Sequence, residues 1–169
     1  MNKAACVIVL AAGQGRRFNG AGHKLAQPLG GSSVLGTTIA QVLGSELPLL
    51  VVTTPGLVAE AAPLVASRDI LVLPDDPLRG MGESLAAGIA ARPDAPAWLV
   101  LPGDMPTVQP ATLRAVAAAL PQHPVAYAQY RGRRGHPVGF SGELFSDLVR
   151  LRGDEGARRV VARYPSQGV

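Results

Sequence analysis

The sequence has 169 residues, which is the length of one ordinary domain and leaves no room for a second full-sized one. Hydrophobic residues make up 47% and charged residues 17%, which supplies a packed core and excludes a disordered chain. The net charge of +4 comes mostly from arginines in short local groups, and aromatic residues are only 4%, so we expect small anionic ligands and no nucleic acid as partners.

The first predicted element is a buried strand at 6–10 that leads directly into a glycine loop. A positive start followed by apolar residues also resembles a short signal peptide, but the run is short for a secretory core and the glycines follow at once. Cys6 is the only cysteine, which excludes an intrachain disulfide and a zinc site of several thiolates. No later apolar stretch approaches the roughly 20 residues that span a bilayer. We therefore expect a soluble cytoplasmic protein with no membrane partner.

Short apolar runs alternate with helix-period segments through the next hundred or so residues. Strands are expected at 6–10, 49–53, 70–73 and 98–101, and helices at 33–43, 55–66, 83–91 and 110–120. Unalternating apolar runs predict strands covered on both faces, so we expect a mostly parallel sheet built from βαβ units. Such a sheet binds its ligands at the carboxyl ends of the strands, which makes the loops after the strands the candidate site.

The pattern changes towards the C-terminus. Residues 125–130 and 136–140 predict an antiparallel pair joined by a turn at 131–135, and residues 143–151 and 157–163 predict two helices. No linker or repeat divides the chain, so residues 1–169 are expected to form a single domain.

The loop after the first strand reads Leu10-Ala11-Ala12-Gly13-Gln14-Gly15-Arg16-Arg17-Phe18. Small residues let backbone N–H groups close around phosphate oxygens, and arginines add charge-assisted hydrogen bonds. Lys24 follows closely enough to reach the same anion. The loop matches neither the P-loop nor the dinucleotide-binding fingerprint, so an NAD-dependent oxidoreductase is a weak alternative. The alternative to phosphate binding is a structural role, in which the glycines only allow the turn from a strand to a helix.

Two later loops add a carboxylate and a second glycine-rich turn. Asp104 directly follows the strand at 98–101 and offers the hard oxygen ligand that magnesium bridging phosphates requires. The alternative is an aspartate that caps the next helix, although Pro110 is the better first residue of that helix. In the loop at 79–84, Gly80 lets a base or ribose approach the backbone and Ser84 can hydrogen-bond to it.

Six segments in order complete the pattern: Leu10-Ala11-Ala12-Gly13-x-x-x-Arg17-Phe18, Lys24-Leu25 with Pro28-Leu29-Gly30-Gly31, Gly80-Met81-Gly82-Glu83-Ser84, Gly103-Asp104-Met105-Pro106, Gly135-His136-Pro137-Val138 and Gly153-Asp154-Glu155-Gly156-Ala157-Arg158. Together they resemble the molybdenum cofactor cytidylyltransferase family, within the glycosyltransferase-A-like nucleotidyltransferases. The resemblance implies an α/β fold, namely a three-layer α/β/α sandwich with a mostly parallel central sheet, as in nucleotide-diphospho-sugar transferases.

The resemblance also implies roles for individual residues. Nucleotide binding is implied for Leu10, Ala11, Ala12, Gly13, Gly15, Arg17, Lys24, Gly80 and Ser84, the last two near the base and ribose. The implied catalytic residues are Arg17, Lys24 and Asp104, and Asp104 is the implied ligand of Mg²⁺. His136 and Asp154 are implied on the pterin side. For these two, a turn-shaping histidine and a helix-capping aspartate are the open alternatives.

The implied reaction transfers CMP from CTP to the phosphate of molybdopterin and releases pyrophosphate. Ala12 stands where the guanylyl branch usually has glycine, and its methyl group would crowd a purine, which favours CTP over GTP. A molybdenum hydroxylase or its maturation factor is the expected further partner. The alternatives are the guanylyl enzyme, transfer to a sugar phosphate, and a maturation chaperone that binds the cofactor and releases no pyrophosphate.

The sequence departs from the family at one end. Relatives generally continue to an Asp-Thr-Pro-like motif, and many supply a second magnesium ligand late in the chain, whereas this sequence ends at Val169. Either the sequence is shorter than its relatives or the metal is held by Asp104, phosphates and water.

Overall fold

The computed structural model describes residues 4–13, 24–153 and 157–169. Within these ranges a seven-stranded sheet contains β1 (Cys6–Ala11), β4 (Leu49–Thr53), β5 (Ile70–Val72), β6 (Ala97–Pro102), β7 (Val125–Tyr130), β8 (Arg133–Ser141) and β9 (Ser166–Gly168). The α-helices are α1 (Val34–Gly44), α2 (Val58–Ala61), α3 (Met81–Ala90), α4 (Pro110–Ala119), α5 (Phe145–Leu148) and α6 (Arg158–Arg163). Single 3₁₀ turns lie at Lys24–Ala26, Pro55–Leu57, Ser67–Asp69 and Gly142–Leu144, and β2 (Pro28–Leu29) pairs with β3 (Ser32–Ser33).

The sheet has the strand order β5-β4-β1-β6-β8-β7-β9. The first four strands in this order are parallel, β8 runs antiparallel to both of its neighbours, and β9 is parallel to β7. The expected mostly parallel sheet and the antiparallel pair near the C-terminus are therefore confirmed. The carboxyl ends of the four parallel strands meet at one edge of the sheet, which is where the candidate loops begin.

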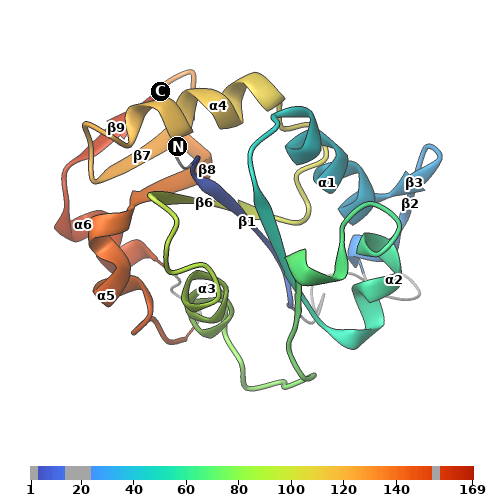
Figure 1. Ribbon diagram of the computed structural model, residues 1–169. Helices are drawn as coiled ribbons and strands as arrows, with labels where there is room; N and C mark the ends of the chain where they lie inside the picture. Colours follow the sequence, from blue (N-terminus) through green and yellow to red (C-terminus); the bar gives the residue numbers. More distant parts are fainter. Residues whose placement is uncertain (1–3, 14–23, 154–156) are drawn as a thin grey trace.

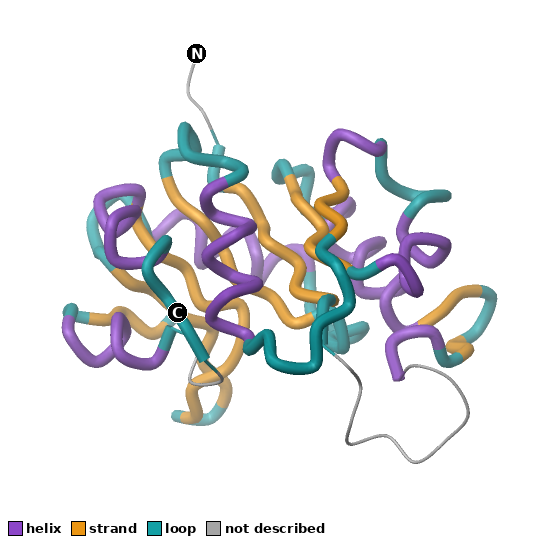
Figure 2. Tube along the Cα trace, turned by 90° about the horizontal axis from the view of Figure 1, so that it is seen from below, coloured by secondary structure: helices purple, strands orange, loops and turns teal. Residues whose placement is uncertain are grey.

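Helices cover both faces of the sheet, which gives the expected three layers (Figure 1). Val7 and Val9 belong to a core that contains residues of α1 and α4, whereas Ile8 and Leu10 belong to a core with residues of α3, α5 and α6. Seen from below, α3 lies in front of the central strands (Figure 2). Because successive strand side chains point to opposite faces, a strand with a core on each side needs apolar residues at every position.

The structure corrects several predicted boundaries. The helix expected at 55–66 is only a 3₁₀ turn followed by α2, because Pro63 has no N–H to donate and restricts the residue before it. The helix expected at 143–151 is likewise a 3₁₀ turn followed by the one-turn α5. The short strands β2, β3 and β9 carry no apolar pattern and were not expected.

Two helix starts bear on the candidate site. The helix α4 begins at Pro110, as predicted, and Gln109 is its N-cap residue. The helix α3 begins at Met81, two residues earlier than predicted, so that Gly80 is its N-cap residue and Ser84 lies within it. In the described ranges, no helix combines the length and apolarity needed to cross a bilayer.

Candidate active site

The turn after β6 is tied to the end of β1. Leu10 pairs with Pro102 in the parallel register, and the N–H of Gly103 donates to the carbonyl oxygen of Leu10 at 2.8 Å. A Cβ atom at Gly103 would lie 3.1 Å from that carbonyl oxygen and 3.0 Å from a methyl group of Leu35, so the close approach favours glycine. Asp104 follows directly and lies well before the start of α4. It therefore does not cap that helix.

Lys24 and Asp104 meet at this edge of the sheet. The Nζ atom of Lys24 lies 2.7 Å from Oδ2 of Asp104, and the two side chains are 48% and 37% exposed. An ion pair with this much contact with water contributes only about 0–1 kcal/mol to stability. The arrangement instead places an ammonium group and a hard carboxylate side by side within reach of solvent.

Side chains from two other segments donate hydrogen bonds to backbone carbonyl oxygens at the end of β1. The hydroxyl of Thr53 donates to the carbonyl oxygen of Ala11 at 3.1 Å, and the guanidinium of Arg79 donates to that of Ala12 at 3.2 Å. Ala11 and Ala12 are buried, whereas Gly13 is exposed. Gly15 and Arg17 lie outside the described residues. The described part of the loop is thus a fixed strand end next to Asp104.

Arg79 was not among the predicted site residues. Its guanidinium also donates to the carbonyl oxygen of Pro74, so it connects the loop before α3 to the end of β1. Its buried Nε atom has no hydrogen-bond partner in the described structure. A lone arginine in a loop carries no sequence signal for the contact with Ala12, because only the fold brings the end of β1 near it. Pro74, in contrast, lies five positions away in the same loop.

The other glycine-rich loop forms the first turn of α3. The N–H of Gly80 donates to the Glu83 carboxylate at 2.7 Å, and this is the usual bond between an N-cap residue and a glutamate three positions on. Ser84 is buried, with its hydroxyl 3.5 Å from the carbonyl oxygen of Gly80. Gly80 and Ser84 therefore belong to the helix start rather than to an open loop.

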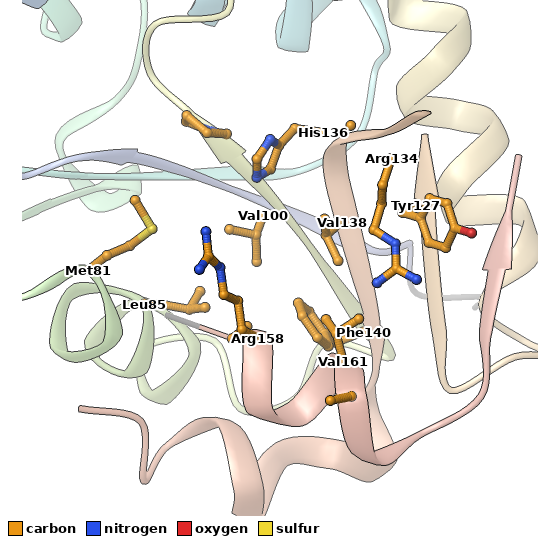
Figure 3. A pocket seen from close by; sticks show the side chains of 14 residues that line it. Met81, Leu85, Val100, Tyr127, Arg134, His136, Val138, Phe140, Arg158 and Val161 are labelled. Atoms are coloured by element: carbon orange, nitrogen blue, oxygen red, sulfur yellow. The ribbon is translucent and has the colours of Figure 1, made fainter. Parts of the chain in front are cut away.

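A pocket of about 630 Å³ opens between α3, β6, β7, β8 and α6 (Figure 3). Its lining residues are Met81, Leu85, Val100, Pro102, Tyr127, Arg134, Gly135, His136, Val138, Phe140, Ala157, Arg158, Val161 and Ala162. Most of them are apolar. Among the lining residues that the structure describes, the polar side chains are two arginines, one histidine and one tyrosine, and none is a carboxylate. The pocket thus suits a ligand with an apolar body and negative charge at its edge.

The cationic side chains lie on different walls of the pocket. Arg134 stacks on Tyr127, with its guanidinium carbon 4.5 Å from the ring centre, which holds the charge on the β8 side. In Figure 3 the Arg158 side chain extends from α6 between Met81 and His136. The structure brings Arg134 and Arg158 to one pocket, and neither of them was among the predicted site residues.

His136 connects the pocket to the charged edge of the sheet. Partial removal of water from its ring lowers the pKa of His136, and the nearby Asp104 carboxylate partly offsets this by raising it. The imidazole is therefore mainly neutral at neutral pH, and it can both donate and accept a hydrogen bond. The predicted pterin-side residue Asp154 lies outside the described residues.

These features fit one protein family. The family described as MobA-like NTP transferase domain matches residues 7–168. The chain belongs to this family. The α/β fold expected from the sequence is confirmed by this membership and by the architecture described above.

Curated relatives of this MobA-like domain differ in length. This chain is 31% identical over 164 residues to purine catabolism protein PucB of Bacillus subtilis, and the match covers 91% of this chain and 78% of PucB. This chain is also 35% identical over 119 residues to the bifunctional protein GlmU of Alkalilimnicola ehrlichii, and the match covers 70% of this chain and 26% of GlmU. The chain spans only 25–30% of the length of the first GlmU relatives, so it corresponds to a part of those proteins.

Solved structures show the same architecture. Rv0371c of Mycobacterium tuberculosis is 29% identical with a TM-score of 0.84, and the match covers 100% of this chain and 88% of that one. Its complex with manganese gives 28% identity, the same coverage and a TM-score of 0.83. Molybdopterin-guanine dinucleotide biosynthesis protein A of Archaeoglobus fulgidus shares the fold at 16% identity, with a TM-score of 0.70 and coverage of 97% and 82%.

The donor set of this MobA-like domain fits a hard divalent cation. In the part of the chain that the structure describes, no three His, Cys, Asp or Glu side chains cluster as a metal site. A single carboxylate is nevertheless enough for Mg²⁺, which keeps several waters and takes further oxygens from phosphates. Asp104 is half-exposed and already faces a cation in Lys24, so its position suits that role.

A thiol nucleophile does not fit the site. Cys6 is buried in β1, and burial raises the pKa of its thiol to about 11. The thiol therefore stays protonated at neutral pH, and the thiolate is the reactive form. Cys6 is a small core residue.

Proposed function

We propose that this protein transfers CMP from CTP to the phosphate of molybdopterin and releases pyrophosphate. The observation that carries the proposal is the meeting of Lys24 and Asp104, at 2.7 Å, where β1 and β6 end beside a cation-lined apolar pocket. One end then offers charges for a triphosphate, and the other offers a place for a bulky anionic acceptor. We further propose that residues 1–169 act as one catalytic domain in the cytoplasm.

On the nucleotide side, the backbone from Leu10 to Gly13 would face the phosphates. Lys24 would release Asp104 and donate to the leaving phosphate oxygens, with Arg17 assisting it. Asp104 would hold Mg²⁺, which when bound neutralises negative charge on the phosphates. Ammonium and guanidinium groups that contact phosphate make charge-assisted hydrogen bonds, which are about twice as strong as neutral ones.

On the acceptor side, the apolar lining would bind the pterin body while Arg134 and Arg158 attract its negative groups. An oxygen of the acceptor phosphate attacks the α-phosphorus of CTP and forms the new P–O bond. The bond to the β-phosphate breaks, and its electron pair leaves with pyrophosphate. A neutral His136 stands between the two substrates and can hydrogen-bond the attacking phosphate.

This chemistry needs no covalent intermediate on the protein. Phosphoryl and nucleotidyl transfer depend on in-line positioning and on stabilisation of charge on the attacking and leaving oxygens. The site supplies cations and a carboxylate, and the one cysteine of the sequence, Cys6, is buried in the core. The composition of the site therefore matches the proposed reaction better than hydrolysis through a nucleophilic side chain.

The choice of CTP rests on Ala12. Ala12 is buried directly after β1, and its carbonyl oxygen accepts a hydrogen bond from the guanidinium of Arg79. This hydrogen bond would limit the backbone shift that a larger base requires. GTP is the alternative nucleotide within the same reaction. A sugar phosphate is the alternative acceptor class for the same site.

A pyrophosphate-release assay tests the proposal directly. CTP and GTP are compared in the presence of Mg²⁺, each with molybdopterin, with a sugar 1-phosphate, or with no acceptor. We expect release only with CTP and molybdopterin. Binding of molybdopterin without release would favour the chaperone alternative, and release with GTP or the sugar phosphate would replace the proposed substrates.

A further inference from the structure

Glu83 connects two segments that are far apart in the sequence. One carboxylate oxygen accepts from the N–H of Gly80 at 2.7 Å, and the other accepts from the N–H of Gly153 at 2.7 Å. The N–H of Gly82 donates in turn to the carbonyl oxygen of Gly153 at 2.8 Å. The bonds between Glu83 and Gly153 and between Gly82 and Gly153 thus join the first turn of α3 to the segment that ends at Gly153.

Helix capping explains only half of this arrangement. A glutamate at the third position of a helix commonly bonds the N–H of the N-cap residue, and the Gly80 bond does so here. The bond to Gly153 spans 70 positions and adds nothing to the cap. The two backbones also touch, since a Cβ atom at Gly82 would lie 2.8–2.9 Å from backbone atoms of Arg152. The contact therefore brings α3 as close to this segment as backbones allow.

The joined segments carry opposite parts of the proposed site. Just before α3, Arg79 holds the carbonyl oxygen of Ala12 at the nucleotide end. On the pocket side, α3 contributes Met81 and α6 contributes Arg158 to the lining (Figure 3). A shift of α6 relative to α3 would move the Arg158 guanidinium relative to the nucleotide.

We propose that Glu83 is a positioning residue, which fixes the Arg158-bearing wall of the acceptor pocket relative to the nucleotide loop. The inference rests on the proposed function, because it assigns the pocket to the acceptor. Glu83 is not among the described residues that line the pocket. It acts through Gly153 on one side and through Gly80 on the other.

The ionised carboxylate is the form that makes these bonds. The N–H of Gly153 is the main cause that lowers the pKa of Glu83, with further lowering from backbone N–H groups and from Arg152. Glu83 is therefore charged at neutral pH, and both bonds are charge-assisted. Glutamine keeps the size of the side chain but offers one acceptor oxygen in place of two, so it can keep only one of the bonds.

The kinetic test compares Glu83→Ala and Glu83→Gln with the matched control Glu143→Gln, an exposed glutamate that does not line the pocket. We expect Glu83→Ala to raise the KM for molybdopterin roughly tenfold, with Glu83→Gln between it and wild type. The dissociation constant of CTP, measured by calorimetry with Mg²⁺, should change less than the KM for molybdopterin. Equal losses for both substrates, or no loss for either, would overturn the positioning role.

A second measurement needs no substrate and therefore separates the two proposals. Amide hydrogen exchange should accelerate at Gly82 and Gly153 in Glu83→Ala, while amides in the middle of α4 keep their wild-type rates. Unchanged exchange at Gly153 would refute the connection, whatever the protein transfers. If wild type turns over no nucleotide but exchange responds as expected, the proposed function fails while the connection stands. Should Glu83→Ala not fold, Glu83→Gln carries both measurements.

Discussion

The two ends of the proposed active site are built in different ways. The nucleotide end consists of short loops directly after two neighbouring strands, and a backbone bond from Gly103 to Leu10 sets its geometry. The acceptor end is a pocket with walls from five elements, from Met81 in α3 to Ala162 in α6. The first end is charged and open to water, whereas the second is mostly apolar with cations at its walls.

This difference suggests that the ends can be disabled separately. Binding and turnover at a charged end depend on single charged side chains, because removing one of them changes the electrostatic field at the reacting phosphates. An apolar pocket depends on the summed contacts of many side chains, so each substitution there should weaken binding without abolishing it. Variants at the two ends should therefore separate nucleotide binding and turnover from acceptor binding.

The largest effect is expected at Asp104. Asp104→Asn keeps the shape of the side chain but removes its charge, and we expect turnover to fall about 10³-fold with Mg²⁺ present. The melting temperature should stay close to that of wild type, because the half-exposed ion pair contributes little to stability. Asp94→Asn, at an exposed aspartate, is the matched control. Wild-type turnover in Asp104→Asn would remove Asp104 from the mechanism.

Lys24 should give the next largest effect at the same end. Lys24→Ala should raise the KM for CTP and lower kcat, with kcat/KM falling roughly 10- to 100-fold for the loss of a charged hydrogen bond. Lys24→Arg keeps the charge and should recover part of this loss. Kinetic constants equal to those of wild type in Lys24→Ala would mean that the ammonium group stays in solvent during the reaction.

Substitutions in the pocket should act on the acceptor instead. We expect Arg134→Ala and Arg158→Ala each to raise the KM for molybdopterin about tenfold, while the dissociation constant of CTP stays within about twofold. Arg133→Ala is the control, because this exposed neighbour in β8 does not line the pocket. A larger loss in CTP binding than in acceptor binding would contradict the separation of the two ends.

The smallest effect concerns the pH dependence of stability. Because the folded protein lowers the pKa of His136 below its ordinary 6.5, the unfolded chain takes up this proton first as the pH falls. The contribution of His136 is fully present above pH 6.5 and is lost as the pH falls through the lower pKa of the folded state. Urea unfolding between pH 7 and pH 5 should show a shallower decline in His136→Gln. An identical decline in both proteins would mean that His136 keeps its ordinary pKa.

Much of the fold could be predicted from local pattern. The strands at 6–10, 49–53 and 98–101 lie within a residue of their observed bounds, because unbroken apolar runs bounded by turns carry a clear signal. The edge strand β9 has no such run. Its backbone pairing with β7 holds it, and a side-chain pattern does not record that pairing.

The candidate site divides in the same way. Asp104 and Lys24 could be singled out from the sequence because each belongs to a short motif in a loop where a parallel sheet exposes ligands. Arg79 and Glu83 could not be assigned their contacts, since the bonds to Ala12 and Gly153 cross 67 and 70 positions. Such contacts depend on the relative placement of helices, and local patterns do not encode it.

The amino-acid sequence alone determined the class of fold, the loops that carry charge and the inert character of its single cysteine. These properties follow from residue type and short-range spacing, which act within a strand or a turn. Only the tertiary structure decided which distant segments meet: the ion pair of Lys24 with Asp104, the pocket with Arg134 and Arg158, and the link from Glu83 to Gly153. The physical reason is that packing of both helix layers onto one sheet sets these distances, and packing depends on the whole chain at once.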